Sequence, residues 1–261
     1  MPSFPASSSL WFSFSSKLPG ILLLLLLGSA PLLAQEKNVS KDSQQWMQYY
    51  HESKLSDSWS FLIDGGFRWK NAINDPSQYI IRTGAGYYLS PMIRVSAGFA
   101  HLGFYSGNKK NKIEYRPYQE ILIKNKWQRL GISQRIRAEE RFFKEVLDGE
   151  VQDPTAFNYR FRYALMARIP LFQLSPTHPD RKLVLAFGDE IFLNAGQEVT
   201  HNVFDQNRFI LSPGLQYSKN LTFSFTWNRQ FGSTSLPSEY KLSDVFWLQV
   251  KHQLDFRGGG S

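Results

Sequence analysis

The sequence predicts an all-β fold, a single antiparallel transmembrane β-barrel of about 12 strands, of which 11 can be recognised directly. Three observations lead to this fold class. One apolar run near the N-terminus has the pattern of an export signal, no second long apolar run follows it, and most of the remaining chain alternates between apolar and polar residues. The second observation excludes a bundle of membrane helices, and the third is typical of strands with one apolar face.

Residues 1–34 predict a signal peptide. One cation, Lys17, precedes an apolar run over 21–27, and the small residue Ala34 stands before a polar stretch. A cation, a short apolar run and a small residue are the parts of a secretory signal, and this run is too short to span a bilayer as a helix. We expect cleavage after Ala34, with an uncleaved anchor as the alternative. Residues 35–43 would then be the N-terminal tail of the mature chain.

Residues 44–256 predict the barrel, because they divide into alternating segments long enough to cross a bilayer at a tilt. Typical globular strands have only five or six residues. The predicted strands are 44–54, 59–70, 78–89, 93–105, 113–124, 127–143, 157–172, 182–194, 205–217, 221–232 and 243–256.

The two faces of each predicted strand differ in chemistry. In 59–70, for example, Trp59, Phe61 and Ile63 share one face, while Asp64 and Arg68 share the other. The apolar faces often begin or end in Trp or Tyr, as in interfacial aromatic belts, and Arg dominates the polar faces. We therefore expect apolar faces toward lipid and polar faces toward a lumen. A soluble exported β-sandwich or lipocalin-like binding protein is the alternative, since its strands would also alternate.

The predicted connections alternate in length. Shorter ones (55–58, 90–92, 125–126, 173–181 and 218–220) would be periplasmic turns, and longer ones such as 144–156, 195–204 and 233–242 would be external loops. Eleven strands would leave the two termini on opposite sides, whereas bacterial barrels normally have an even number. A twelfth strand within 36–44, a tail passing through the lumen, or one wrongly divided segment would resolve this, and we expect twelve strands.

The last predicted strand ends in Phe256. A terminal aromatic on an alternating strand resembles the signal that outer-membrane barrels present to the barrel-assembly machinery, so we expect this machinery as a partner. Residues 257–261 follow as a flexible C-terminal tail.

Charged residues on the polar faces are the candidate functional set. Arg predominates, and its planar fork can hold carboxylates through two parallel hydrogen bonds. Two interpretations stay open: ion pairs that fill and neutralise a narrow lumen, or a basic constriction that passes small anions. The predicted lumen residues are Asp64, Arg68, Arg82, Arg94, Glu114, Arg116, Glu120, Arg129, Arg135, Arg137, Glu139, Arg141, Arg160, Arg162, Arg168, Glu190 and Arg208.

Catalytic and cofactor motifs are not found. The chain has 0 Cys, which excludes disulfides, thiolate zinc sites and thiol catalysis, and its 5 His are scattered. Some barrels are lipid-modifying enzymes that use Ser and His, and here His101 with Ser96 or Ser106 is the only pairing of note. We expect no enzyme activity, no catalytic residues, no metal and no cofactor, with a lipid-modifying barrel enzyme as the alternative.

The charge balance of the chain is basic, with 30 Lys plus Arg against 22 Asp plus Glu. Nucleic acid is not the expected partner, because the basic residues alternate with apolar ones along strands of an exported chain. Outer-membrane lipid and lipopolysaccharide are expected instead.

Several stretches, in order, resemble a family of uncharacterised Bacteroidetes-type outer-membrane proteins, DUF2490. They include Gln45-Trp46, Arg82-Thr83-Gly84-Ala85-Gly86-Tyr87, Glu114-Tyr115-Arg116-Pro117-Tyr118-Gln119, Gln134-Arg135-Ile136-Arg137-Ala138-Glu139-Glu140-Arg141 and Gly188-Asp189-Glu190-Ile191-Phe192. The resemblance implies a β-barrel in the bacterial outer membrane and supplies no catalytic residues. The expected function is thus a non-enzymatic barrel of unknown specific role: a small anion-favouring channel, or a structural barrel with a charge-plugged lumen.

Overall fold

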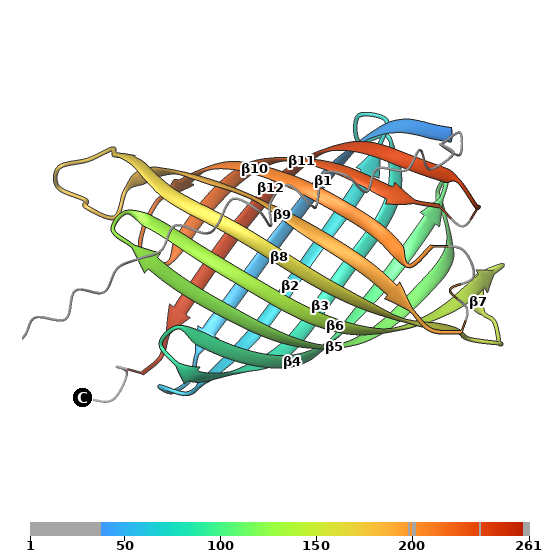
Figure 1. The fold of residues 1–261 in the computed structure, drawn as a ribbon, viewed down its shortest axis with the longest axis horizontal. Helices are drawn as coiled ribbons and strands as arrows, with labels where there is room; N and C mark the ends of the chain where they lie inside the picture. Colours follow the sequence, from blue (N-terminus) through green and yellow to red (C-terminus); the bar gives the residue numbers. More distant parts are fainter. Residues whose placement is uncertain (1–37, 198, 200–201, 235, 258–261) are drawn as a thin grey trace, which may run out of the picture. The chain divides into compact units, whose positions relative to one another are not determined.

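A computed structural model describes residues 38–197, 199, 202–234 and 236–257 of the chain, so the predicted signal peptide lies outside the described residues. The described residues form strands joined by turns and loops, without a helix (Figure 1). Among them, no helix is long and apolar enough to cross a membrane. The strands are β1 (Asn38–Lys54), β2 (Trp59–Lys70), β3 (Asp75–Ser90), β4 (Ile93–Ser106), β5 (Lys109–Trp127), β6 (Leu130–Leu147), β7 (Glu150–Val151), β8 (Ala156–Gln173), β9 (Lys182–Ala195), β10 (Phe204–Gln216), β11 (Leu221–Ser233) and β12 (Glu239–Asp255).

Eleven of these strands close into one barrel, which confirms the predicted all-β barrel fold of about 12 strands. Successive wall strands pair antiparallel, and the sheet closes where β1 meets β12. The remaining strand, the two-residue β7, pairs only with β6, in the loop between β6 and β8. Figure 1 shows the wall strands running at a tilt around the barrel, as closure of a sheet requires.

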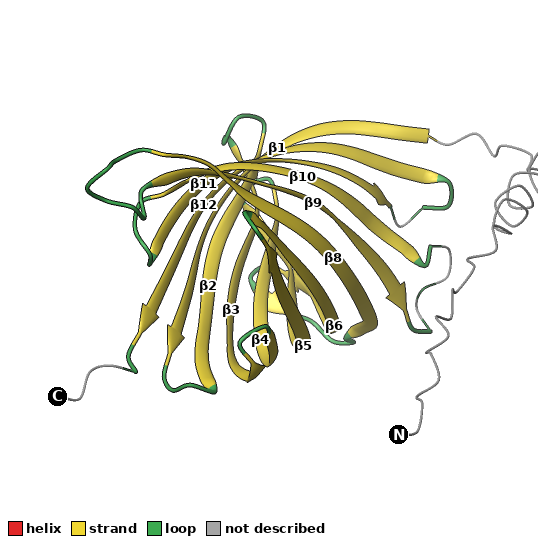
Figure 2. Cartoon of the chain, turned by 60° about the vertical axis from the view of Figure 1, so that its left-hand side comes forward, coloured by secondary structure: helices red, strands yellow, loops and turns green. Residues whose placement is uncertain are grey.

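The closing seam is parallel, because an up-and-down barrel with an odd number of strands brings its first and last strands together in the same direction. The pairing runs without a register shift from Asn38 opposite Glu239 to Lys54 opposite Asp255. After the seam, the Phe256 amide still donates to the Lys54 carbonyl oxygen at 3.0 Å. Consequently β1 begins at one end of the barrel and β12 finishes at the other (Figure 2).

The first strand differs from its predicted bounds. Residues 38–43, expected as part of a tail, extend β1 and pair with β12. A separate wall strand within 36–44 is therefore not what resolves the odd count, and the start of β1 lies at the opposite end of the barrel from the end of β12.

The faces follow the alternation of the sequence. Trp59, Phe61 and Ile63 are 51%, 41% and 40% exposed on the outer surface, whereas the intervening Ser60 is 1% exposed. Side chains at every second position thus face the lumen, and polar residues occupy most of these positions.

The two ends of the barrel differ less in loop length than the sequence predicts. At one end of the barrel the connections are 55–58, 91–92, 128–129, 174–181 and 217–220. At the other end they are 71–74, 107–108, 148–155, the connection from β9 to β10 and the connection from β11 to β12. The connections 71–74 and 107–108 are shorter than the predicted strand bounds imply, because β3 begins at Asp75 rather than at 78 and β5 at Lys109 rather than at 113.

Two glycines make room for an aromatic side chain inside the barrel. Gly84 and Gly98 lie opposite each other on β3 and β4. A Cβ at Gly98 would overlap the Thr83 carbonyl oxygen and the Tyr118 hydroxyl, and one at Gly84 would meet the same hydroxyl. The pair therefore forms a shallow seat for Tyr118, which is 4% exposed.

We expect Gly98→Ala to lower the free energy of unfolding by about 1–3 kcal/mol, because the added methyl overpacks the seat. Gly131→Ala is the matched control: its nearest neighbour would be the Arg168 carbonyl oxygen at 3.6 Å, an ordinary contact. Urea unfolding of the two variants in detergent measures the difference. Equal stability of the two variants would mean that Tyr118 does not pack on Gly98.

Candidate functional site

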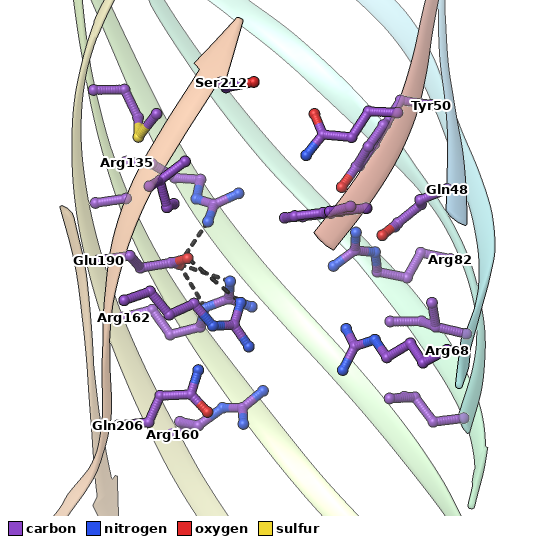
Figure 3. Close-up of a pocket in the computed structure, with 18 of the residues that line it drawn as sticks. Gln48, Tyr50, Arg68, Arg82, Arg135, Arg160, Arg162, Glu190, Gln206 and Ser212 are labelled. Atoms are coloured by element: carbon purple, nitrogen blue, oxygen red, sulfur yellow. Dashed lines mark hydrogen bonds and ion pairs between the residues drawn. The ribbon is translucent and has the colours of Figure 1, made fainter. Parts of the chain in front are cut away.

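The barrel encloses a cavity of about 450 Å³ that touches every wall strand except β11 (Figure 3). A second cavity, of about 210 Å³, lies toward the end where β1 begins and β11 finishes. Four residues line both cavities: Arg68, Asp205, Gln206 and Arg208. The two cavities therefore follow one another along the lumen.

Charged side chains enter this space because alternation sends them inward and the strand register sets opposite charges side by side. Glu120 lies opposite Arg137, Glu139 opposite Arg160, and Asp64 opposite Arg82. Directly opposite residues on neighbouring strands are close enough for their side chains to interact.

Glu139 is the centre of the largest ion cluster and is fully buried. Arg160 and Arg162, from β8, reach its carboxylate oxygens at 2.6 and 2.7 Å. Arg137 and Arg116 add further guanidinium groups at 3.7 and 3.8 Å. A carboxylate without water is thereby compensated by four cations, as a buried charge requires.

Glu190 is the second centre, and Figure 3 shows the arginines that converge on it. Its Oε1 atom lies 2.6 Å from Arg135 Nη2 and 2.6 Å from Arg162 Nη2. Arg162 bonds Glu139 as well, so it joins the two centres.

Further pairs extend the cluster along the wall. Glu120 lies 2.5 Å from Arg137, and Glu114 lies 2.6 Å from Arg116. Other close pairs in the lumen include Arg141 with Glu114, Arg82 with Asp64, Arg94 with Glu52, and Arg160 with Asp205.

Sequence reasoning missed Glu52 and Asp205. Glu52 could have been found, because it shares the inward parity of Gln48 and Tyr50 on β1. Asp205 lies at a register shift between Phe204 and Gln206, where simple alternation no longer predicts the face.

Sixteen of the seventeen predicted lumen residues occupy inward-facing strand positions, and one does not. Arg129 is exposed in the turn 128–129, where it donates to the carbonyl oxygens of Pro170 and Leu171. The hairpin turns later than the predicted 125–126, with Gln128 at a φ of 51°. Arg129 therefore falls outside the lumen.

Several inward-facing cations have no carboxylate within 4 Å among the residues that the structure describes, among them Arg68, Lys124, Arg168 and Lys251. Arg68 donates to Gln78 and Arg168 donates to Gln216, each at 2.7 Å. The lumen thus keeps positive charge that its own carboxylates do not neutralise.

The structure does not bring together the His and Ser residues that were considered for hydrolytic chemistry. His101 lies 2.8 Å from the Tyr79 hydroxyl, while Ser96 has the opposite parity and is buried inside the barrel. A pair that sequence reasoning missed is His51 with Ser53, whose Nε2 and Oγ atoms are 2.6 Å apart on the outer face of β1. The sequence could have indicated this pair, because residues two positions apart in a strand have their side chains on the same face.

This pair differs from a catalytic triad in two respects. Ser53 is 7% exposed, and His51 has a tyrosine, Tyr49, rather than a carboxylate near its Nδ1 atom. Within the described part of the chain, no group of three or more His, Asp or Glu side chains could hold a metal ion.

Comparison with known proteins gives one match. The family model described as "Protein of unknown function (DUF2490)" matches residues 43–240. No curated protein and no solved structure matches the chain.

We expect Glu139→Gln to lower the free energy of unfolding by about 3–5 kcal/mol, because it removes the buried negative charge that Arg160 and Arg162 share. Asp153→Asn is the control, since Asp153 is 83% exposed in its pair with Lys144 and such pairs contribute about 0–1 kcal/mol. Denaturant unfolding in detergent compares them. A similar small loss for both variants would contradict the central role of Glu139.

Proposed function

This chain belongs to the DUF2490 family, a family of unknown function, and we propose that it is a non-enzymatic outer-membrane β-barrel whose basic lumen lets small anions pass. The observation that carries the proposal is the charge of the larger cavity. Eight arginines and Lys251 line it, against two carboxylates, Glu190 and Asp205.

The outer face supports the membrane part of the proposal. Its exposed side chains are largely apolar, among them Phe225 at 51%, Leu248 at 48% and Phe67 at 57%. So much exposed apolar surface around a closed barrel favours a lipid environment over water.

Aromatic pairs toward both ends of the outer face add to this support. Trp59 and Tyr87 lie with ring centroids 5.0 Å apart near one end, where β2 begins. Phe231 and Tyr240 lie 5.0 Å apart near the other, where β11 finishes. Aromatic residues at two levels are typical of the interfacial girdles of membrane barrels.

The unpaired cations support the passage of anions. Lys251 and Arg168 lie on the half of the lumen near the end of β12, and Arg68 lies where the two cavities meet. Rings of Arg and Lys favour anions in pores because they stabilise negative charge and repel cations.

A structural barrel with a charge-plugged lumen is the second candidate. It is favoured by the complete burial of Glu114 and Glu139, whose contacts with arginine fill that side of the lumen.

Partners follow from the same proposal. Lys109 and Lys110, exposed where β5 begins, would contact lipopolysaccharide phosphates, and β12 with Phe256 would engage the barrel-assembly machinery. Residues 1–34 would direct export.

We expect the mature protein in the outer-membrane fraction, resistant to carbonate extraction, because its apolar surface requires lipid. Unboiled protein should migrate differently from boiled protein on a gel, since a closed barrel resists detergent. Recovery of most of the protein in the soluble periplasm would contradict the membrane location.

We expect purified protein in a planar bilayer to conduct with a preference for chloride over potassium. Lys251→Glu should reverse or abolish the preference, because it reverses a lumen charge that has no carboxylate partner among the described residues. Lys219→Glu makes the same change in net charge in the exposed turn 217–220 and should alter the preference far less.

Either of two results would decide against this function. Absence of steady conductance in the wild type would favour the charge-plugged barrel. A cation-selective wild type would contradict both candidates.

A further inference from the structure

We infer that the lumen contains a binding site for one small oxyanion of the phosphate class, formed by Arg68 and Arg208 where the two cavities meet. The inference rests on the proposed function in that small anions must be able to enter the lumen. It goes further by assigning the residues that hold the anion and its chemical class.

The position of Arg68 in the sheet leaves its charge without a counterion. Its two cross-strand neighbours are Trp46 on β1 and Gln78 on β3, both neutral. The guanidinium carbon lies 3.8 Å from the centroid of the Trp46 ring, and Nη1 donates to Gln78 Oε1 at 2.7 Å. These contacts orient the guanidinium group but add no negative charge.

Arg208 is left in a similar state for a different reason. Its cross-strand neighbour on β9 is Glu190, but Arg135 and Arg162 already hold that carboxylate at 2.6 Å. Arg208 approaches it only to 3.8 Å and instead donates from Nε to Gln230 Oε1 at 2.8 Å. A neutral amide is again the close partner.

One aromatic ring links the two cations. The Arg208 guanidinium carbon lies 5.4 Å from the centroid of the Trp46 ring that Arg68 covers. Two like charges against one ring are unfavourable unless an anion reduces their repulsion.

The surroundings suit an oxyanion. Trp247, whose ring centroid lies 5.2 Å from that of Trp46, lines the larger cavity, and its indole N–H has no hydrogen-bond partner in the described structure. Guanidinium groups present pairs of N–H donors that match phosphate oxygens. Phosphate has several oxygens and can accept hydrogen bonds from two guanidinium groups at once, whereas a halide ion has no oxygens to pair with them. Carboxylates share part of this chemistry but offer fewer oxygens.

The test uses the full mature chain in detergent micelles, titrated with inorganic phosphate at constant ionic strength and followed by calorimetry. We expect saturable binding that Arg68→Gln weakens about tenfold or more, because the variant removes a charged fork without breaking an ion pair. Arg181→Gln is the matched control: Arg181 also stacks on an aromatic ring, that of Tyr217, but in an exposed connection outside the lumen.

A second readout separates binding at this site from binding elsewhere. Phosphate should change the tryptophan emission, and Trp46→Phe should remove most of that change, while Trp59→Phe, a variant on the outer face at the far end of β2, should not. A parallel titration with acetate tests whether the site prefers carboxylates, and acetate should bind more weakly than phosphate.

The outcomes distinguish the two proposals. Anion-selective conductance with no saturable phosphate binding would overturn this site and leave the proposed function standing. Phosphate binding that Arg68→Gln does not weaken, or acetate binding tighter than phosphate, would also overturn it. Saturable binding that is lost in Arg68→Gln would support the site even if the barrel conducts no current.

Discussion

Ion pairing between guanidinium and carboxylate groups is the interaction on which the barrel interior depends. Sheet closure gives every wall strand an inward face, and the sequence fills much of it with arginine. Burying such charges without partners would cost several kcal/mol each. The register avoids most of this cost by setting Glu120 opposite Arg137 and Glu139 opposite Arg160. Because Arg162 bonds both Glu139 and Glu190, the pairs join into one cluster that ties β5, β6, β8 and β9 together across the lumen side of the wall.

The odd number of wall strands is the second constraint, and it fixes the direction of the seam. Parallel pairing is slightly weaker per residue than antiparallel pairing. The seam is nevertheless long, from Asn38 to Lys54, and it has no register shift. Aromatic packing across it adds to the backbone hydrogen bonds: Trp46 and Trp247 lie opposite each other, with ring centroids 5.2 Å apart. The seam thus brings Trp247 against Trp46, the ring that Arg68 covers, so the odd strand count also shapes the candidate anion site.

The sequence predicts the faces of the strands better than their partners, for a geometric reason. A turn at 125–126 would have set Glu120 opposite Gly131, whereas the actual turn at 128–129 sets Arg137 there. The shift in pairing is an even number of residues, so every side chain keeps its predicted face while each cross-strand contact changes. The lumen set was therefore largely predictable, but the ion pairs were not. Two residues depart from their predicted faces. Arg129 was predicted in the lumen but lies in the displaced turn, and Asp205 was not predicted there but faces the lumen at a register shift.

The distribution of charge around the lumen explains why paired and unpaired arginines coexist. Carboxylates concentrate on β5, β6 and β9, and the arginines near them are held by short ion pairs. The opposite part of the wall, formed by β1, β2, β11 and β12, presents mainly amides, hydroxyls and indoles, such as Gln48, Thr226 and Trp247. Two of its carboxylates, Glu52 and Asp64, are already held by Arg94 and Arg82. Arg68 and Lys251 stand on that part, so their charges meet dipoles and rings rather than counterions. The lumen consequently has one side whose charges are neutralised by ion pairs and another on which Arg68 and Lys251 have no carboxylate within 4 Å among the described residues. If the lumen passes anions as we propose, an anion moving along the axis would follow the second side from Lys251 toward Arg68.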